Sequence, residues 1–213
     1  MANPVNGIDV SHFNGNINWT EVAATQTFVY IKATQGTSYT DPMCRTNATA
    51  VSNTSLRMGY YHFATLENTG NVTADAQQQA NWFAQTINNM PACTLVPMLD
   101  IEANAGNLPA AEVQTWISAF LAEMKANGFP LVFIYSYPAF LNSNLPAGHP
   151  FGSQPLWIAD YTTAAQPTLP HGWSSYVIWQ YSGSGQVNGV PTQCDLDRST
   201  DVLLGPIYSQ QSY

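Results

Sequence analysis

Short apolar runs separated by polar turn residues recur along this chain and predict eight strands. Most runs are four to eight residues long, which is typical of strands buried in a core. We expect strands at residues 7–11, 28–33, 58–63, 95–102, 131–135, 156–159, 177–181 and 194–196. The run at 95–102 differs from the others because it ends in two acids, Asp100 and Glu102.

Apolar residues at helical spacing lie between the first six strands. We expect helical segments around Trp19, from about Asp41, from about Thr73 and over 113–124, and a short apolar piece at 139–141. Beyond residue 159 the connecting segments contain too many Pro or Gly residues for full helices. The pattern therefore predicts an α/β fold, an eight-stranded TIM-like β/α barrel with the last helices missing.

The composition narrows the class of protein. The length of 213 residues, without a break in composition, predicts one catalytic barrel domain over residues 1–213. A net charge of −8 with only five basic residues argues against nucleic acid or an anionic membrane as partner. No apolar run is long enough to span a membrane. Because uncharged polar residues carry most of the polarity, we expect a secreted protein. We also expect it to be a monomer.

Two further signals concern the cell compartment. The first residues, Met1–Pro4, resemble no signal peptide, so the protein is either not secreted or has lost its leader. Four Asn-x-Ser/Thr sites favour a lost leader; they begin at Asn18, Asn47, Asn53 and Asn71. The three cysteines, Cys44, Cys93 and Cys194, allow at most one disulfide, and all three pairings stay open. Their spacing matches no zinc site, and we expect no metal or organic cofactor.

Acidic residues collect where the expected strands end. In a β/α barrel chemistry lies at the carboxyl end of the strands, and this end carries Asp9, His62, Asp100, Glu102, Asp160 and Asp195. Asp100 and Glu102 share one face of their strand, within roughly 7 Å of each other, so one of them is expected to hold a proton near neutral pH. A single strand that ends in acids at the solvent is the ordinary alternative. Acids on four strands with few basic partners favour a negatively charged cleft.

Such a cleft suits the cleavage of glycosides. This reaction needs an acid for the leaving oxygen and negative charge against an oxocarbenium-like transition state. Four strand aromatics, Tyr61, Tyr135, Trp157 and Trp179, either stack on sugar rings or fill the core.

At these residues the sequence resembles the lysozymes of glycoside hydrolase family 25, the Chalaropsis-type muramidases. The resemblance covers essentially the whole chain, and its motifs follow one another in the family's order. The motifs are Gly7–Ser11, Tyr30–Gly36, Gly59–Phe63, Asp100–Glu102, Leu156–Tyr161, Trp179–Tyr181 and Asp195–Asp197. The family's fold is a barrel without its last helices.

The resemblance implies roles for individual residues. Glu102 would be the general acid/base, Asp100 would assist the intermediate, and Asp9 and Asp195 would complete the acidic floor. Asp197 shares a face with Asp195, so these two assignments could be exchanged. Substrate-binding positions would be Lys32, Tyr61, His62, Tyr135, Trp157, Asp160, Trp179 and Asp197. The alternatives are that Lys32 only neutralises the acids and that His62 is a satisfied core histidine.

The resemblance and the residues together predict a muramidase. It would hydrolyse the β-1,4 bond between N-acetylmuramic acid and N-acetylglucosamine in bacterial peptidoglycan, with net retention. Two alternatives are a hydrolase of chitin-like N-acetylglucosamine polymers and a catalytically silent carbohydrate-binding barrel. Muropeptides released from bacterial wall would distinguish the first prediction from both.

Overall fold

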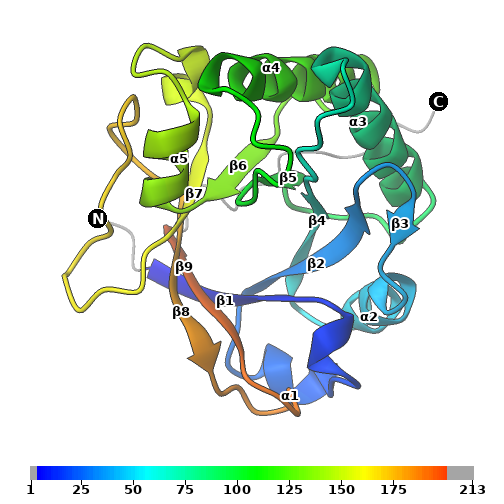
Figure 1. Cartoon of the computed structure of the whole chain (residues 1–213). Helices are drawn as coiled ribbons and strands as arrows, with labels where there is room; N and C mark the ends of the chain where they lie inside the picture. Colours follow the sequence, from blue (N-terminus) through cyan, green and yellow to red (C-terminus); the bar gives the residue numbers. More distant parts are fainter. Residues whose placement is uncertain (1–3, 201–213) are drawn as a thin grey trace.

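Eight strands close into a barrel in the order β1-β9-β8-β7-β6-β5-β4-β2, and pairing of β1 with β2 completes the ring (Figure 1). The computed structural model describes residues 4–200, so residues 1–3 and 201–213 of the predicted domain lie outside the described part. The barrel strands are β1 (Pro4–Val10), β2 (Phe28–Gln35), β4 (Arg57–Phe63), β5 (Met98–Asp100), β6 (Phe133–Ser136), β7 (Leu156–Ala159), β8 (Ile178–Gly185) and β9 (Cys194–Thr200). A ninth strand, β3 (Tyr39–Thr40), forms an antiparallel hairpin with β2. The predicted eight-stranded barrel is confirmed.

The last barrel strand runs opposite to the others. The pairs from β1 through β8 are parallel, whereas β9 is antiparallel to both β8 and β1. The amino end of β9 therefore lies beside the carboxyl ends of the other strands, and Asp195 pairs with Asp9. Asp195 was predicted at the carboxyl end of its strand. It lies instead near the beginning of the reversed strand β9, at the same rim of the barrel.

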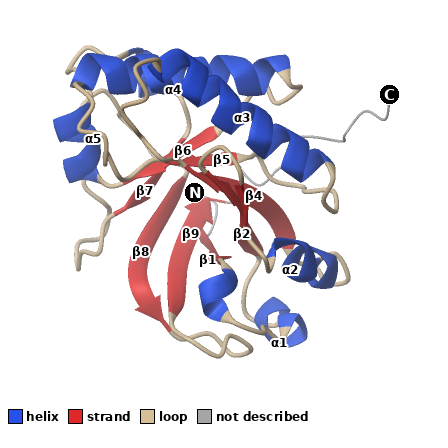
Figure 2. Cartoon of the chain, turned by 45° about the vertical axis from the view of Figure 1, so that its right-hand side comes forward, coloured by secondary structure: helices blue, strands red, loops and turns tan. Residues whose placement is uncertain are grey.

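Helices connect the strands as far as β7. They are α1 (Trp19–Ala23), α2 (Cys44–Val51), α3 (Val72–Asn88), α4 (Ala110–Ala126) and α5 (Pro138–Asn144), with short 3-10 helices at His12–Asn14 and Pro150–Ser153. The connections from β7 to β8 and from β8 to β9 contain no helix. Figure 2 shows that no helix covers the side of the barrel where β8 lies. The prediction that the last helices are missing is thus confirmed. The apolar piece at 139–141 belongs to α5, which carries Pro138 in its first turn.

Alternation along the strands divides the core into two parts. On β2, Tyr30 packs inside the barrel with Trp157 and Phe133, while Ile31 packs outside against the helices. Gly59 makes the interior packing possible, because a Cβ atom there would lie 2.4 Å from Cε1 of Tyr30. Aromatic side chains therefore fill the barrel, and the polar side chains gather at its rim.

The strand that ends at Asp100, β5, is shorter than predicted. The sequence predicts a strand over 95–102, but β5 covers only Met98–Asp100. Pro97 has no N–H group to donate, so the ladder begins at Met98. Beyond β5 the N–H of Ile101 still donates to the carbonyl of Tyr135, at 3.0 Å. This bond keeps the chain extended, and Glu102 follows the strand as its first cleft-facing loop residue.

The structure bears on the two sequence features that concern the cell compartment, the cysteines and the Asn-x-Ser/Thr sites. All three cysteines are free thiols, so the single disulfide that their number allows is not formed. Asn47 is only 1% exposed on α2, whereas Asn18, Asn53 and Asn71 are exposed. Three of the four glycosylation sites are therefore accessible in the folded protein. Among residues 4–200, no helix has the length and apolar character needed to cross a membrane.

Candidate active site

Five carboxyl groups meet at the rim of the barrel. Asp9 comes from β1, Asp100 ends β5, Glu102 follows it, and Asp195 and Asp197 come from the first half of β9. Asp9, Asp100 and Asp197 are buried, while Asp195 and Glu102 are half-buried. The acids predicted from the sequence are thus brought together in one cluster.

Burial and mutual repulsion raise the pKa values of these acids. Burial raises the pKa of Asp100 well above its usual range, and the charges of Glu102 and Asp9 raise it further. Burial also raises the pKa of Glu102, with Asp195 as the next cause. The Lys32 ammonium opposes both shifts. Glu102 therefore combines access to the cleft with a raised proton affinity, as a general acid requires.

Asp9 and Asp197 form the deep part of the cluster. The amide of Gln180 donates to Oδ2 of Asp9 at 2.7 Å, and the indole N–H of Trp157 donates to Oδ1 of Asp197 at 3.1 Å. Oδ2 of Asp197 is buried without a donor among the described residues, but Asp9 lies within hydrogen-bonding reach. A proton between the two carboxyl groups satisfies both. Asp197 is therefore the deep member of the β9 pair, and half-buried Asp195 is the one that faces the cleft.

Asp100 keeps one oxygen free. Its Oδ1 atom is buried and has no hydrogen-bond partner within residues 4–200. Ile101, the next residue, packs on the opposite side of the chain in the outer core, so Asp100 and Glu102 face the same way. Buried polar atoms without a partner are rare in folded proteins, so the orphaned oxygen marks Asp100 as a candidate for a functional role.

Lys32, Tyr61 and Tyr135 lie against the acid cluster. The Lys32 ammonium donates to Oε1 of Gln35 at 2.8 Å and lies over the ring of Phe63, 4.7 Å from its centre. Burial lowers the pKa of Lys32, and the charge of Asp100 is the largest opposing effect. Burial raises the pKa of Tyr61 well above its usual range, followed by the charges of Asp9 and Asp100. The structure thus places these side chains beside the acids, and their contact with substrate stays a prediction.

His62 does not reach the cleft. It is fully buried, and its ring lies 5.4 Å from that of Phe120 on α4. Gln79 Oε1 accepts the backbone N–H of Thr65 at 3.1 Å and also faces Nε2 of His62 at 3.0 Å. His62 Nε2 therefore carries the proton, and Nδ1 accepts from the Thr34 hydroxyl at 2.8 Å. The expected sugar contact is corrected: His62 is a satisfied core histidine.

The predicted aromatic stacking positions are also buried. Trp157 is fully buried and Trp179 is 6% exposed, with its N–H donating to the carbonyl of Asp160 at 2.8 Å. Tyr61 and Tyr135 are each 8% exposed. The structure thus resolves the open alternative toward core packing for both tryptophans: Trp157 packs inside the barrel beneath the acids, and Trp179 packs in the outer core. Asp160 lines the cleft, and its Oδ2 atom accepts the backbone N–H of Thr168 at 2.7 Å.

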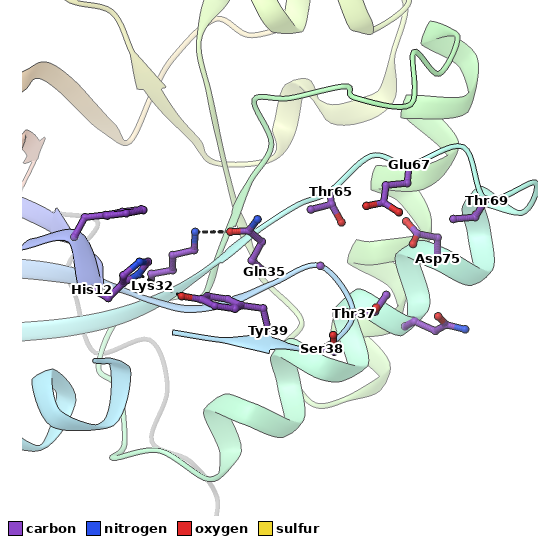
Figure 3. Close-up of a pocket in the computed structure, with 13 residues that line it drawn as sticks. His12, Lys32, Gln35, Thr37, Ser38, Tyr39, Thr65, Glu67, Thr69 and Asp75 are labelled. Atoms are coloured by element: carbon purple, nitrogen blue, oxygen red, sulfur yellow. Dashed lines mark hydrogen bonds between the residues drawn. The ribbon is translucent and has the colours of Figure 1, made fainter. Parts of the chain in front are cut away.

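Two hollows border the acid cluster. The β2 groove, about 590 Å³, contains Lys32 and the loop after β2, and Figure 3 shows Lys32, Gln35 and Tyr39 near one end and Glu67 and Asp75 near the other. The β7 pocket, about 510 Å³, contains Glu102 and the loops after β6 and β7. Its lining residues are Glu102, Tyr135, Tyr137, Pro138, Ala139, Ala159, Asp160, Tyr161 and Thr168.

Exposed aromatic side chains mark both hollows. Phe13 and Tyr39 line the β2 groove, and Tyr137 and Tyr161 line the β7 pocket. They are the only large apolar side chains that residues 4–200 leave exposed. Tyr137 and Tyr161 lie just after β6 and β7, Phe13 lies in the 3-10 helix after β1, and Tyr39 begins β3. Sequence analysis did not assign them, although loop aromatics directly after barrel strands were the available signal. Aromatic faces beside a carboxylate cluster are suited to sugar rings.

The barrel and its site define a class of enzyme. Within residues 4–200, no three or more His, Cys, Asp and Glu side chains are grouped to hold a metal ion. A proton-holding Glu, further carboxyl groups and flanking aromatic platforms are the elements of acid-catalysed glycoside cleavage. The fold and the site are those of a barrel glycoside hydrolase.

Comparison with known proteins gives the family. The sequence model of glycosyl hydrolases family 25 matches residues 8–190, and the chain belongs to this family. Lysozyme M1 of Streptomyces globisporus is 37% identical over 204 residues, which cover 92% of this chain and 67% of the relative. The N,O-diacetylmuramidase of Chalaropsis is 32% identical, covering 87% and 91%. The crystal structure of a lysozyme from Streptomyces coelicolor has a TM-score of 0.81 at 32% identity, covering 94% and 95%.

The buried histidine generates a test of the fold around the site. Burial lowers the pKa of His62 from 6.5 to about 4. Between pH 6.5 and pH 4 the His62 imidazole binds a proton in the unfolded chain but stays neutral in the folded protein. Over this range the free energy of unfolding of wild type therefore falls by about 3 kcal/mol through His62. His62→Gln removes that loss. Urea unfolding should show the stability gap between wild type and variant closing by about this amount on acidification; a gap independent of pH would contradict the assignment.

Proposed function

We propose that Glu102 is the proton donor with which this enzyme, a peptidoglycan-hydrolysing N-acetylmuramidase, cleaves the β-1,4 bond between N-acetylmuramic acid and N-acetylglucosamine. The observation that carries this role is the combination at Glu102 of a raised pKa and a place in the β7 pocket. Its family and its lysozyme and muramidase relatives support the substrate. They do not favour a chitin-specific hydrolase or a silent binding barrel.

Asp100 is proposed to act on the substrate's 2-acetamido group. Its Oδ1 atom has no hydrogen-bond partner among residues 4–200, and a carboxyl group beside Glu102 suits the acetamido N–H. An acetamido group held there can use its own oxygen as the nucleophile, closing to an oxazolinium while Glu102 protonates the leaving oxygen. Water then opens the ring with Glu102 as base, and the product has retained configuration. Asp9 is already engaged by Gln180 and its carboxyl neighbours, which favours electrostatic support over nucleophilic attack.

The two hollows suggest how a polymer lies on the enzyme. A glycan strand that crosses the acid cluster would place neighbouring sugars in the β2 groove and the β7 pocket. The exposed rings of Phe13, Tyr39, Tyr137 and Tyr161 offer the stacking surfaces. Because its substrate is bacterial cell wall, we propose that the chain acts outside the cell as a secreted, monomeric enzyme with a single catalytic barrel domain.

Replacing Glu102 by Gln tests the proton donor. The amide keeps the shape of the side chain but cannot donate the proton, so turnover should fall at least ~100-fold with unchanged folding. Glu112→Gln is the matched control, because Glu112 is exposed in the first turn of α4. The assay is release of reducing ends from purified peptidoglycan, with products identified by mass. A Glu102→Gln enzyme that keeps more than a tenth of the turnover would exclude the role, and cleavage of chitin alone would exclude the substrate.

The pH dependence follows from the acid cluster. Glu102 must be protonated to act, and burial with the charge of Asp195 raises its pKa. Activity should therefore peak on the acidic side of neutrality and decline as rising pH removes this proton. Added salt should alter the profile, because enzyme and wall both become more negative as the pH rises. Rates on soluble wall fragments across pH 3–10 test this, and a profile that still rises at pH 9 would contradict it.

The stereochemistry of the first product tests the role of Asp100. Proton NMR during the first minutes should show the β anomer, because substrate assistance proceeds with net retention. A slow fluorinated substrate should leave no ester on the protein. Initial formation of the α anomer, or a glycosyl ester on Asp9 or Asp100, would rule out the assisted route.

A further inference from the structure

One buried amide connects the acid cluster to the β7 pocket. Gln180 on β8 is 2% exposed and uses both ends of its side chain. Its Nε2 atom donates to Oδ2 of Asp9 at 2.7 Å. Its Oε1 atom accepts the hydroxyl groups of Tyr135, at 2.9 Å, and Tyr161, at 2.7 Å. The contact with a carboxyl group on one side and two hydroxyl donors on the other fixes the orientation of the amide.

Tyr161 combines an anchored hydroxyl with an accessible ring. The residue is 62% exposed and lines the β7 pocket together with Glu102. The preceding residue, Asp160, is held to β8 at both backbone groups: its N–H donates to the carbonyl of Gln180 at 3.1 Å, and its carbonyl accepts from the Trp179 indole at 2.8 Å. Three hydrogen bonds thus fasten an exposed aromatic ring to one strand. Such fastening lowers the entropy that a binding surface loses when a ligand orders it.

Gly183 provides the space for this ring. A Cβ atom on Gly183 would lie 2.8 Å from Oη, 3.0 Å from Cζ and 3.1 Å from Cε2 of Tyr161. The tyrosine therefore lies directly against the backbone of β8. Gly183 does not adopt a positive φ, so its lack of a side chain matters for the contact and not for the conformation of the strand. An alanine at this position would push the Tyr161 hydroxyl away from Gln180.

We propose that Tyr161 is a sugar-stacking platform of the β7 pocket and that Gln180 and Gly183 are positioning residues that hold it in place and join it to Asp9. This inference rests on the proposed function, since the ligand of the platform is the glycan strand of that reaction. Sugar rings stack on rigid aromatic faces, and this ring borders the same pocket as the proton donor. Because the same amide also holds Asp9, the platform and the floor of the acid cluster share one support.

Gly183→Ala, compared with Gly148→Ala, is the central experiment. Gly148 is exposed, and a Cβ atom there would meet nothing within 4 Å, so it is the matched control. On soluble peptidoglycan oligosaccharides, Gly183→Ala should raise KM about three- to tenfold, the range expected for a lost aromatic contact, with kcat within about twofold. Gly148→Ala should leave both constants unchanged. Tyr161→Phe keeps the ring without its anchor and should raise KM in the same direction, while Tyr161→Ala should raise it most.

A Gln180 variant tests whether one side chain positions both Tyr161 and Asp9. Gln180→Leu releases Tyr161 and also removes the donor from Asp9, so it should lower kcat as well as raise KM. Adding Gly183→Ala to Gln180→Leu should raise KM no further, because both changes act on the same anchor. Additive effects would overturn the link. Thermal unfolding of each variant identifies any that fails to fold, and in that case Tyr161→Phe and Gly183→Ala decide.

The outcomes separate this inference from the proposed function. If wild type releases muropeptides but Gly183→Ala and Tyr161→Phe have the same KM as wild type, the platform is disproved and the muramidase assignment stands. If wild type releases no muropeptides, the proposed function itself fails.

Discussion

The repulsion among five carboxyl groups is the constraint on which the site depends. Within the described residues Lys32 is the cation that acts on Asp100 and Glu102, and burial removes much of the water that would otherwise stabilise the charges of the cluster. The cluster exists because protons and neutral donors replace the absent cations. The Gln180 amide donates to Asp9, the Trp157 indole donates to Asp197, and the two carboxyl groups lie within hydrogen-bonding reach of each other. Burial, together with the charge of Asp195, raises the pKa of Glu102 and so favours the protonated form that catalysis needs.

The barrel supports this cluster by filling itself with aromatic side chains. Tyr30, Trp157 and Phe133 occupy the interior and leave the polar groups at the rim. Trp157 shows the connection most directly, because it is packed on the rings of Tyr30 and Tyr135 while its N–H holds Asp197. The edge of the hydrophobic core is thus also the floor of the active site. At Asp197 the hydrogen bond from the buried Trp157 indole replaces one that water would otherwise provide.

Much of the fold and the acid cluster could be predicted from the sequence, because both depend on local patterns. Apolar periodicity marks the strands, and the acids follow directly at their ends. The direction of β9 could not be predicted, since a short apolar strand reads the same in parallel and antiparallel pairing. Nor could the burial of His62, which depends on α3 and α4 covering its face of β4. The role of Gln180 depends on contacts with Asp9, 171 residues away, and with Tyr161, 19 residues away. Such contacts leave no local pattern.

The reversed β9 strand has a consequence for the order in which the enzyme acquires activity. Asp9 lies on the first barrel strand, and its partners Asp195 and Asp197 lie on the last, so the cluster closes only when the two ends of the barrel sequence pair. Contacts between such distant segments form late, because the loop between them must close first. During synthesis the ribosome therefore releases Glu102 and Asp100 long before the segment that completes their surroundings. Until β9 has been synthesised and has paired with β1, the acid cluster lacks Asp195 and Asp197, and the active site is incomplete.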